Sequence, residues 1–190
     1  MALSRTLARR VTSALDEGSL VRVTTSPAHA DTVTMFVVGV GSKWVLGVSV
    51  VDGHFDGHVA VRVNDVRRVR RDASFETRMA RTLPQWPPEA QPDAPLDSTG
   101  ALLRWFADRY PLIGMERGRD RRALWIGALR EAQKPWLALH EVDSRAEWNL
   151  SPLYYRRGRV TAVTGGTRYM LALASIAGPA PAIDPSRSGR

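Results

Sequence analysis

The stretch DGHFDGH, residues 52–58, holds four side chains that could ligate a metal ion. Asp52, His54, Asp56 and His58 alternate along the chain, and alternate side chains of an extended strand point to one side. Imidazole and carboxylate ligands suit zinc or manganese. The same stretch contains two Asp-Gly pairs, which indicate turns, and a turn would break the alternation. We therefore predict no bound metal and no cofactor, and keep the four residues as minor metal-ligand candidates.

Three arginine-rich runs, RRVRR, RGRDRR and RRGR, supply the densest positive charge. Such runs can contact phosphate groups, and binding of this kind weakens strongly as salt increases. A charged run on an edge strand can instead act by discouraging strand-to-strand aggregation. The candidate nucleic-acid contacts are Arg67, Arg68, Arg70, Arg71, Arg119, Arg121, Arg122, Arg156, Arg157, Gly158 and Arg159.

Composition sets limits on the classes of protein that this chain can belong to. The formal net charge is +8, and a basic balance favours anionic partners such as nucleic acid. Only two of the 27 basic residues are lysines, Lys43 and Lys134, so the arginine excess can also reflect the coding bias of a GC-rich genome. The absence of cysteine excludes disulfides, a cysteine-ligated zinc site and a cysteine nucleophile.

No sequence motif indicates catalysis. The chain has neither a GxSxG elbow nor an HExxH pair, so we predict a protein that is not an enzyme, although residues distant in sequence could still assemble an active site. The stretch GGTRY, residues 165–169, could bind phosphate at the start of a helix. It lacks the lysine and the spacing of a P-loop, and Thr167 as a helix N-cap is the preferred interpretation.

The elements that position these residues occur twice. Residues 59–82 align without a gap with residues 153–176, and upstream segments match in the same order. Each unit begins with an amphipathic helix, continues with about five short strands and ends with a second helix. Trp44 and Trp136 occupy corresponding places, and we expect both to pack in the core.

This pattern predicts an α+β, mostly β fold made of two repeated units. Each unit would be an N-terminal helix, a small five-stranded Sm-like or SH3-like barrel and a closing helix. The first unit covers residues 1–83 and the second residues 98–177. Residues 84–97, rich in proline, would form an extended linker, and residues 178–190 a disordered tail.

The final strand-turn-strand of the second unit resembles that of the Sm-like proteins. RRGRVTAV, residues 156–163, is similar to the second Sm signature, in which an Arg-Gly turn joins the last two strands and holds RNA. The resemblance implies that Arg157 and Gly158 would contact RNA. The first unit has Asn64-Asp65 at the aligned turn, and the first Sm signature is absent. The wider layout also resembles uncharacterised bacterial proteins built as tandem small barrels.

Three hypotheses for function follow from the sequence. The first is a non-enzymatic scaffold, acting as a protein-interaction adaptor through a barrel groove or the linker. The alternative is an RNA- or DNA-binding regulator that uses arginine-rich barrel edges, and the third is a metal protein or enzyme. No apolar run reaches the roughly 18 residues of a membrane helix, and the N-terminus has no apolar core of a secretory signal. We expect a bacterial cytoplasmic protein without membrane association, monomeric or dimeric.

Overall fold

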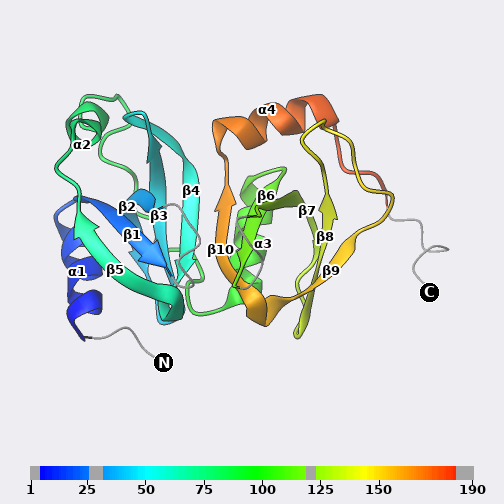
Figure 1. The fold of residues 1–190 in the computed structure, drawn as a ribbon, viewed down its shortest axis with the longest axis horizontal. Coiled ribbons are helices and arrows are strands. Elements are labelled where there is room, and N and C mark those ends of the chain that lie inside the picture. The colour runs from blue at the N-terminus through cyan, green and yellow to red at the C-terminus, as the bar shows by residue number, and fades with distance from the viewer. Residues whose placement is uncertain (1–4, 26–31, 119–122, 183–190) are drawn as a thin grey trace.

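The protein is built on a single antiparallel sheet of ten strands (Figure 1). The computed structural model describes residues 5–25, 32–118 and 123–182. The strands are β1 (Leu20–Thr25), β2 (Val33–Val40), β3 (Trp44–Val51), β4 (His54–Arg62), β5 (Val66–Arg71), β6 (Ile113–Arg117), β7 (Trp125–Glu131), β8 (Trp136–Glu141), β9 (Leu153–Arg156) and β10 (Val160–Gly165). The helices are α1 (Arg5–Asp16), α2 (Phe75–Ala80), α3 (Thr99–Arg109) and α4 (Arg168–Ala177), with short 3₁₀ turns η1 (Val63–Asp65) and η2 (Arg157–Arg159).

The strand order is β5-β1-β2-β3-β4-β10-β6-β7-β8-β9. The first half of the chain therefore supplies five neighbouring strands, and the second half supplies the other five. The two halves meet where β4 pairs with β10, in register from Val61 opposite Ala162 to His58 opposite Gly165. Figure 1 shows these two strands side by side in the middle of the molecule. We call this pairing the junction.

The predicted pair of five-stranded barrels is wrong, because the strands form one open sheet. The apolar pattern of β4 fits either arrangement, and pairing with β10 is what makes the sheet continuous. Val59, Ala60 and Val61 are consecutive and all buried, which means that both faces of β4 are covered. An inner strand of a larger sheet meets that condition, and the junction makes β4 such a strand.

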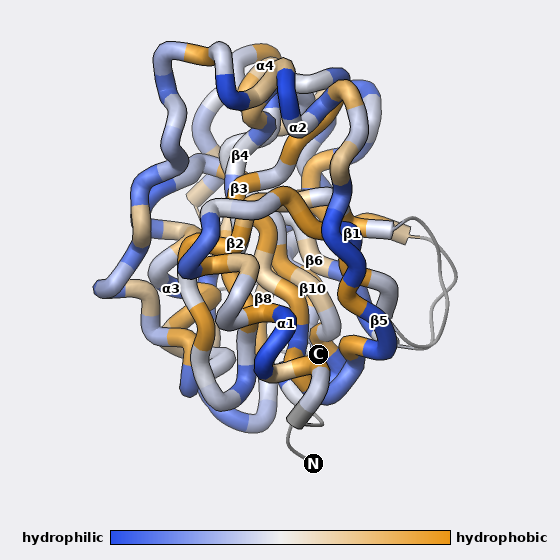
Figure 2. The backbone as a smooth tube through the Cα atoms, turned by 90° about the vertical axis from the view of Figure 1, so that its left-hand side faces the viewer, coloured by the Kyte–Doolittle hydropathy of each residue, from blue (hydrophilic) through white to orange (hydrophobic). Residues whose placement is uncertain are grey.

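The hydrophobic core also crosses from one half to the other. Its largest cluster contains Trp44 and Leu46 of β3 together with Phe106 of α3 and Ile113 of β6. Figure 2 shows hydrophobic stretches along strands in the interior, with hydrophilic segments at the outside. Helix α3 therefore packs against both halves, and the two halves share buried surface as well as strand pairing.

Two helix caps follow the chemistry expected of them. The Ser98 hydroxyl accepts a hydrogen bond from the Ala101 N–H at the start of α3, and Thr167 accepts one from the Met170 N–H at the start of α4. The prediction of Thr167 as an N-cap is thus confirmed. Ser74 precedes α2 without a side-chain cap bond, and Phe75, the first residue of α2, is 65% exposed.

The proline-rich segment, residues 84–97, lies against the first half. Leu96 is buried in the shared core, and the Gln91 N–H donates to the Val38 carbonyl at 3.1 Å. Trp86 packs edge-on against Phe36. Asp93 of this segment accepts a hydrogen bond from the Trp105 indole of α3 at 3.2 Å and pairs with Arg109, so the segment also contacts α3 directly. None of the helices in the described residues is both long enough and apolar enough to cross a membrane.

Candidate functional site

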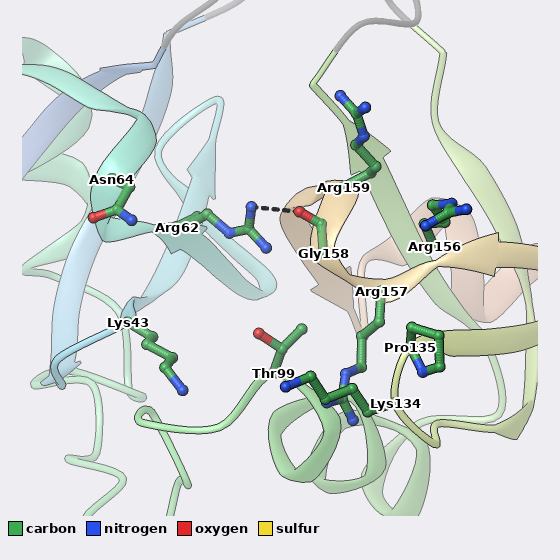
Figure 3. A pocket seen from close by; sticks show the side chains of 10 residues that line it. All are labelled: Lys43, Arg62, Asn64, Thr99, Lys134, Pro135, Arg156, Arg157, Gly158 and Arg159. Atoms are coloured by element: carbon green, nitrogen blue, oxygen red, sulfur yellow. Dashed lines mark hydrogen bonds between the residues drawn. The ribbon is translucent and has the colours of Figure 1, made fainter. Parts of the chain in front are cut away.

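A pocket of about 570 Å³ opens where the two halves meet, and most of the side chains around it are cationic. We call it the junction pocket. Figure 3 shows the residues of the first half on one side and those of the second half on the other. Its lining consists of Lys43, Arg62, Asn64, Thr99, Lys134, Pro135, Arg156, Arg157, Gly158 and Arg159.

The second half presents its arginines on the turn η2, between β9 and β10. The turn is one 3₁₀ turn, and Gly158 within it does not have a positive φ. The turn therefore does not depend on the ability of glycine to adopt a positive φ. Gly158 carries a different role, because its carbonyl accepts a hydrogen bond from Arg62 of β4 at 2.8 Å. That bond ties the two walls of the pocket together.

Helix α3 forms the floor behind Arg157. The Arg157 guanidinium donates to the Ala132 carbonyl at 3.1 Å and lies against Gly100, where a Cβ would collide with it. Thr99, the first residue of α3, accepts a hydrogen bond from the Trp44 indole at 3.2 Å. The positive end of the helix dipole therefore faces the same space as the cationic side chains.

Six cationic side chains line the junction pocket, and no carboxylate does. Within the described parts of the chain, none of the six forms a salt bridge. Two carboxylates lie near the pocket without lining it. Hydrogen bonds from Ser42 hold the pKa of Asp97 below its usual value, with help from Lys43, and burial raises the pKa of Asp65. The excess of positive charge remains, and like charges gathered in this way attract an anion.

The arginines of the RRVRR run lie elsewhere, on β5 at one end of the sheet. All four are exposed, and Arg68, Arg70 and Arg71 line a separate pocket of about 500 Å³ beside α1. Arg71 also pairs with Glu17. The arginines of residues 156–159 therefore lie in the junction pocket, whereas the arginines of β5 lie in a different pocket. The candidates Arg119, Arg121 and Arg122 lie outside the described residues.

The four metal-ligand candidates are separated by the local fold. Asp52 lies in the turn before β4 with a φ of 53°, and its carbonyl contacts the ring of His54. Asp56 accepts a hydrogen bond from the Arg168 N–H at 2.8 Å and so joins the first half to α4. His58 turns inward. Among the described residues, no three His, Cys, Asp or Glu side chains form a group that could hold a metal ion.

The imidazole of His58 is packed between the halves. Its Nδ1 is 2.5 Å from the Tyr110 hydroxyl, and the centre of its ring lies 5.9 Å from that of Trp105, which it meets edge-on. Its Nε2 has no hydrogen-bond partner among the residues that the structure describes. Burial lowers the pKa of His58 below 6.5, and the Arg109 guanidinium adds to that effect. The folded protein therefore favours the neutral ring.

We expect this histidine to make the protein less stable in mild acid. Because its pKa is lower in the folded state, the unfolded chain binds the proton more readily, so the free energy of unfolding falls as pH drops below about 6.5. Above that pH the ring is neutral in both states and contributes no slope. Urea unfolding at pH 5.5 and 7.5 measures the difference, which should shrink in His58→Gln. An equal difference in both proteins would contradict the assignment.

Sequence reasoning missed three of the six cations, Lys43, Arg62 and Lys134, because they come from three separate segments. One signal was present in the sequence. Lysine occurs only twice in the whole chain, and both lysines line the same pocket. Coding bias toward arginine explains scattered arginines and does not explain this coincidence. The prediction that Trp136 packs in the core is also wrong, because its side chain is 43% exposed.

The sequence and the mostly-β fold were compared with known families, proteins and structures. No protein-family model, no curated protein and no solved structure matches the chain. The resemblance to Sm-like and SH3-like proteins therefore stays a prediction.

Proposed function

We propose that this protein is a non-enzymatic nucleic-acid-binding protein whose junction pocket holds phosphate groups. The observation that supports this proposal is the convergence of six cationic side chains from both halves without a lining carboxylate. Repulsion among these cations raises the energy of the empty pocket, and a phosphate removes that cost. Guanidinium groups supply paired donors that match phosphate oxygens, and the two ammonium groups act as point charges.

A polymer fits the surroundings better than a single small anion. The positive surface continues past the pocket, because Arg156 and Arg159 also line a neighbouring pocket that includes Arg117. A chain of phosphates can use both pockets, whereas one phosphate fills only part of the first. The net charge of +8 favours such a partner at longer range. A cytoplasmic location, where nucleic acids are accessible, belongs to the same proposal.

The protein-interaction adaptor predicted from the sequence stays a prediction. No feature of the described residues points to a protein partner of a particular chemistry. The basic pocket, in contrast, specifies the chemistry of its ligand.

The proposal is tested by fluorescence anisotropy with labelled RNA and DNA oligonucleotides at 50 and 200 mM salt. If four to six cations contact phosphates, the salt slope for a single strand is about −0.7 per contact, so affinity should fall roughly 100-fold over this range. A shallow slope, or no binding at 50 mM salt, would contradict a phosphate-binding role. Inorganic phosphate, added at matched ionic strength, is the competitor in a control titration. It should displace the oligonucleotide efficiently only if the pocket is a site for a single small anion.

A further inference from the structure

The hairpin formed by β8 and β9 presents two large aromatic side chains on its outer face. Trp136 is 43% exposed and Tyr154 is 64% exposed. Trp136 pairs across the hairpin with Arg156, and Ala138 pairs with Tyr154. Since side chains two residues apart share a face of a strand, Trp136, Tyr154 and Arg156 all lie on the same side. The opposite face, with Leu137 and Tyr155, is buried in the shared core.

A second pocket, of about 270 Å³, lies between this hairpin, the end of β6 and the turn η2, and we call it the hairpin pocket. Arg117 of β6 and Tyr155 of the buried face also line it. Trp136 and Tyr154 line it, together with Arg156 and Arg159, which also line the junction pocket. The Arg156 guanidinium lies 4.9 Å from the centre of the Trp136 ring. The cationic pocket therefore leads directly into a pocket with aromatic rings and a guanidinium plane.

This combination matches the chemistry that binds an unpaired nucleobase. A base has a flat π face that stacks on aromatic rings and on guanidinium groups, and this stacking does not depend on the identity of the base. In a duplex the bases are stacked on each other and their faces are covered. Only a single strand can place a base on Trp136 or Tyr154 while its neighbouring phosphates lie in the junction pocket.

We infer that the ligand is single-stranded nucleic acid, with a base stacked in the hairpin pocket beside phosphates in the junction pocket. The inference rests on the proposed function and adds the kind of strand that is bound. It also explains why two exposed rings are found beside the cationic pocket. Exposed aromatic surface of this kind marks interaction sites, and the arginines around it select an anionic partner.

The test compares single-stranded and duplex oligonucleotides of one sequence, as RNA and as DNA, with the wild-type protein and with Trp136→Leu and Tyr154→Leu. We expect tighter binding of the single strand, and loss of a stacking ring should weaken it about 10-fold or more. Duplex affinity should not change, nor should the salt slope, because no charge is removed. Trp136→Phe and Tyr154→Phe keep a ring and should retain most of the affinity.

Controls separate stacking from folding and from general surface effects. Tyr169→Leu removes a ring that is 55% exposed outside both pockets, and it should bind like the wild type. Thermal melting checks that each variant is folded. A stacked base also quenches indole emission, so the quenching lost in Trp136→Phe reports contact at Trp136 in a fully folded protein.

The outcomes distinguish the inference from the proposed function. Equal affinity for single strand and duplex would overturn the inference and leave the phosphate-binding proposal standing. So would a loss of affinity in Trp136→Leu and Tyr154→Leu that is as large for the duplex as for the single strand. Salt-dependent binding that neither aromatic substitution weakens would do the same. If neither form of nucleic acid binds at 50 mM salt, both proposals are wrong.

Discussion

Lys43→Glu/Lys134→Glu is expected to bind single-stranded oligonucleotide on the order of 100- to 1,000-fold more weakly than the wild type at low salt. The two substitutions remove two contacts with phosphates and add two negative charges that repel them. Both side chains are exposed, so folding should be unaffected. Titrations by fluorescence anisotropy at 50 mM salt measure the affinity, and a salt series should give a shallower slope.

A charge-matched variant shows whether the effect is local. Arg68→Glu/Arg70→Glu makes the same change in net charge on β5, in the pocket beside α1. If the junction pocket is the site, this variant should lose far less affinity than the lysine variant. Similar losses in the two variants would mean that the whole surface attracts the ligand, and the assignment to the junction pocket would be wrong.

Gly57→Ala is expected to destabilise the protein by about 3 kcal/mol or more, because it acts on the junction itself. Gly57 has a φ of 73°, a backbone conformation that other residues adopt only with strain. A Cβ there would also lie 2.6 Å from the Gly166 carbonyl carbon and 2.7 Å from the Thr167 nitrogen. These are backbone atoms next to β10, so β4 and β10 would have to separate. Chemical denaturation measures the loss.

Gly158→Ala is the matched control for this substitution. Gly158 has no positive φ, and an added Cβ would meet nothing within 4 Å. We expect unchanged or slightly increased stability, since alanine restricts the unfolded chain. The Gly158 carbonyl that accepts from Arg62 is retained. A large loss of stability in this control, or none in Gly57→Ala, would show that the geometry of the junction has been misjudged.

Local signals in the sequence predicted local structure well. Thr167 was recognisable as a cap because a hydroxyl before an apolar run satisfies a free N–H within three residues. The pairing of β4 with β10 could not be predicted in the same way. Val59, Ala60 and Val61 are apolar whether β4 curls back on its own half or continues into the next one, and the choice depends on a strand about 100 residues away.

The candidate site was predictable only where its residues are contiguous. Arg156, Arg157 and Arg159 stand together in the chain and were recognised as a cluster. Lys43 and Lys134 reach the same pocket only because α3 and the junction place their loops side by side, and no spacing in the sequence encodes that. The run on β5 was denser in charge, yet it lies at the far end of the sheet.

The Arg62–Gly158 hydrogen bond joins the two halves at the wall of the junction pocket. Binding in the pocket is therefore linked thermodynamically to the association of the two halves. In the proposed complex, a strand held by Lys43 and Arg62 on one wall and by Lys134 and Arg157 on the other would act as a clamp across the junction. Its binding free energy would add to the stability of the folded state. By reciprocity, the free energy by which a bound strand opposes opening of the junction equals the free energy that opening of the junction takes from binding. Gly57→Ala and Lys43→Glu/Lys134→Glu thus probe a single coupling from its two ends.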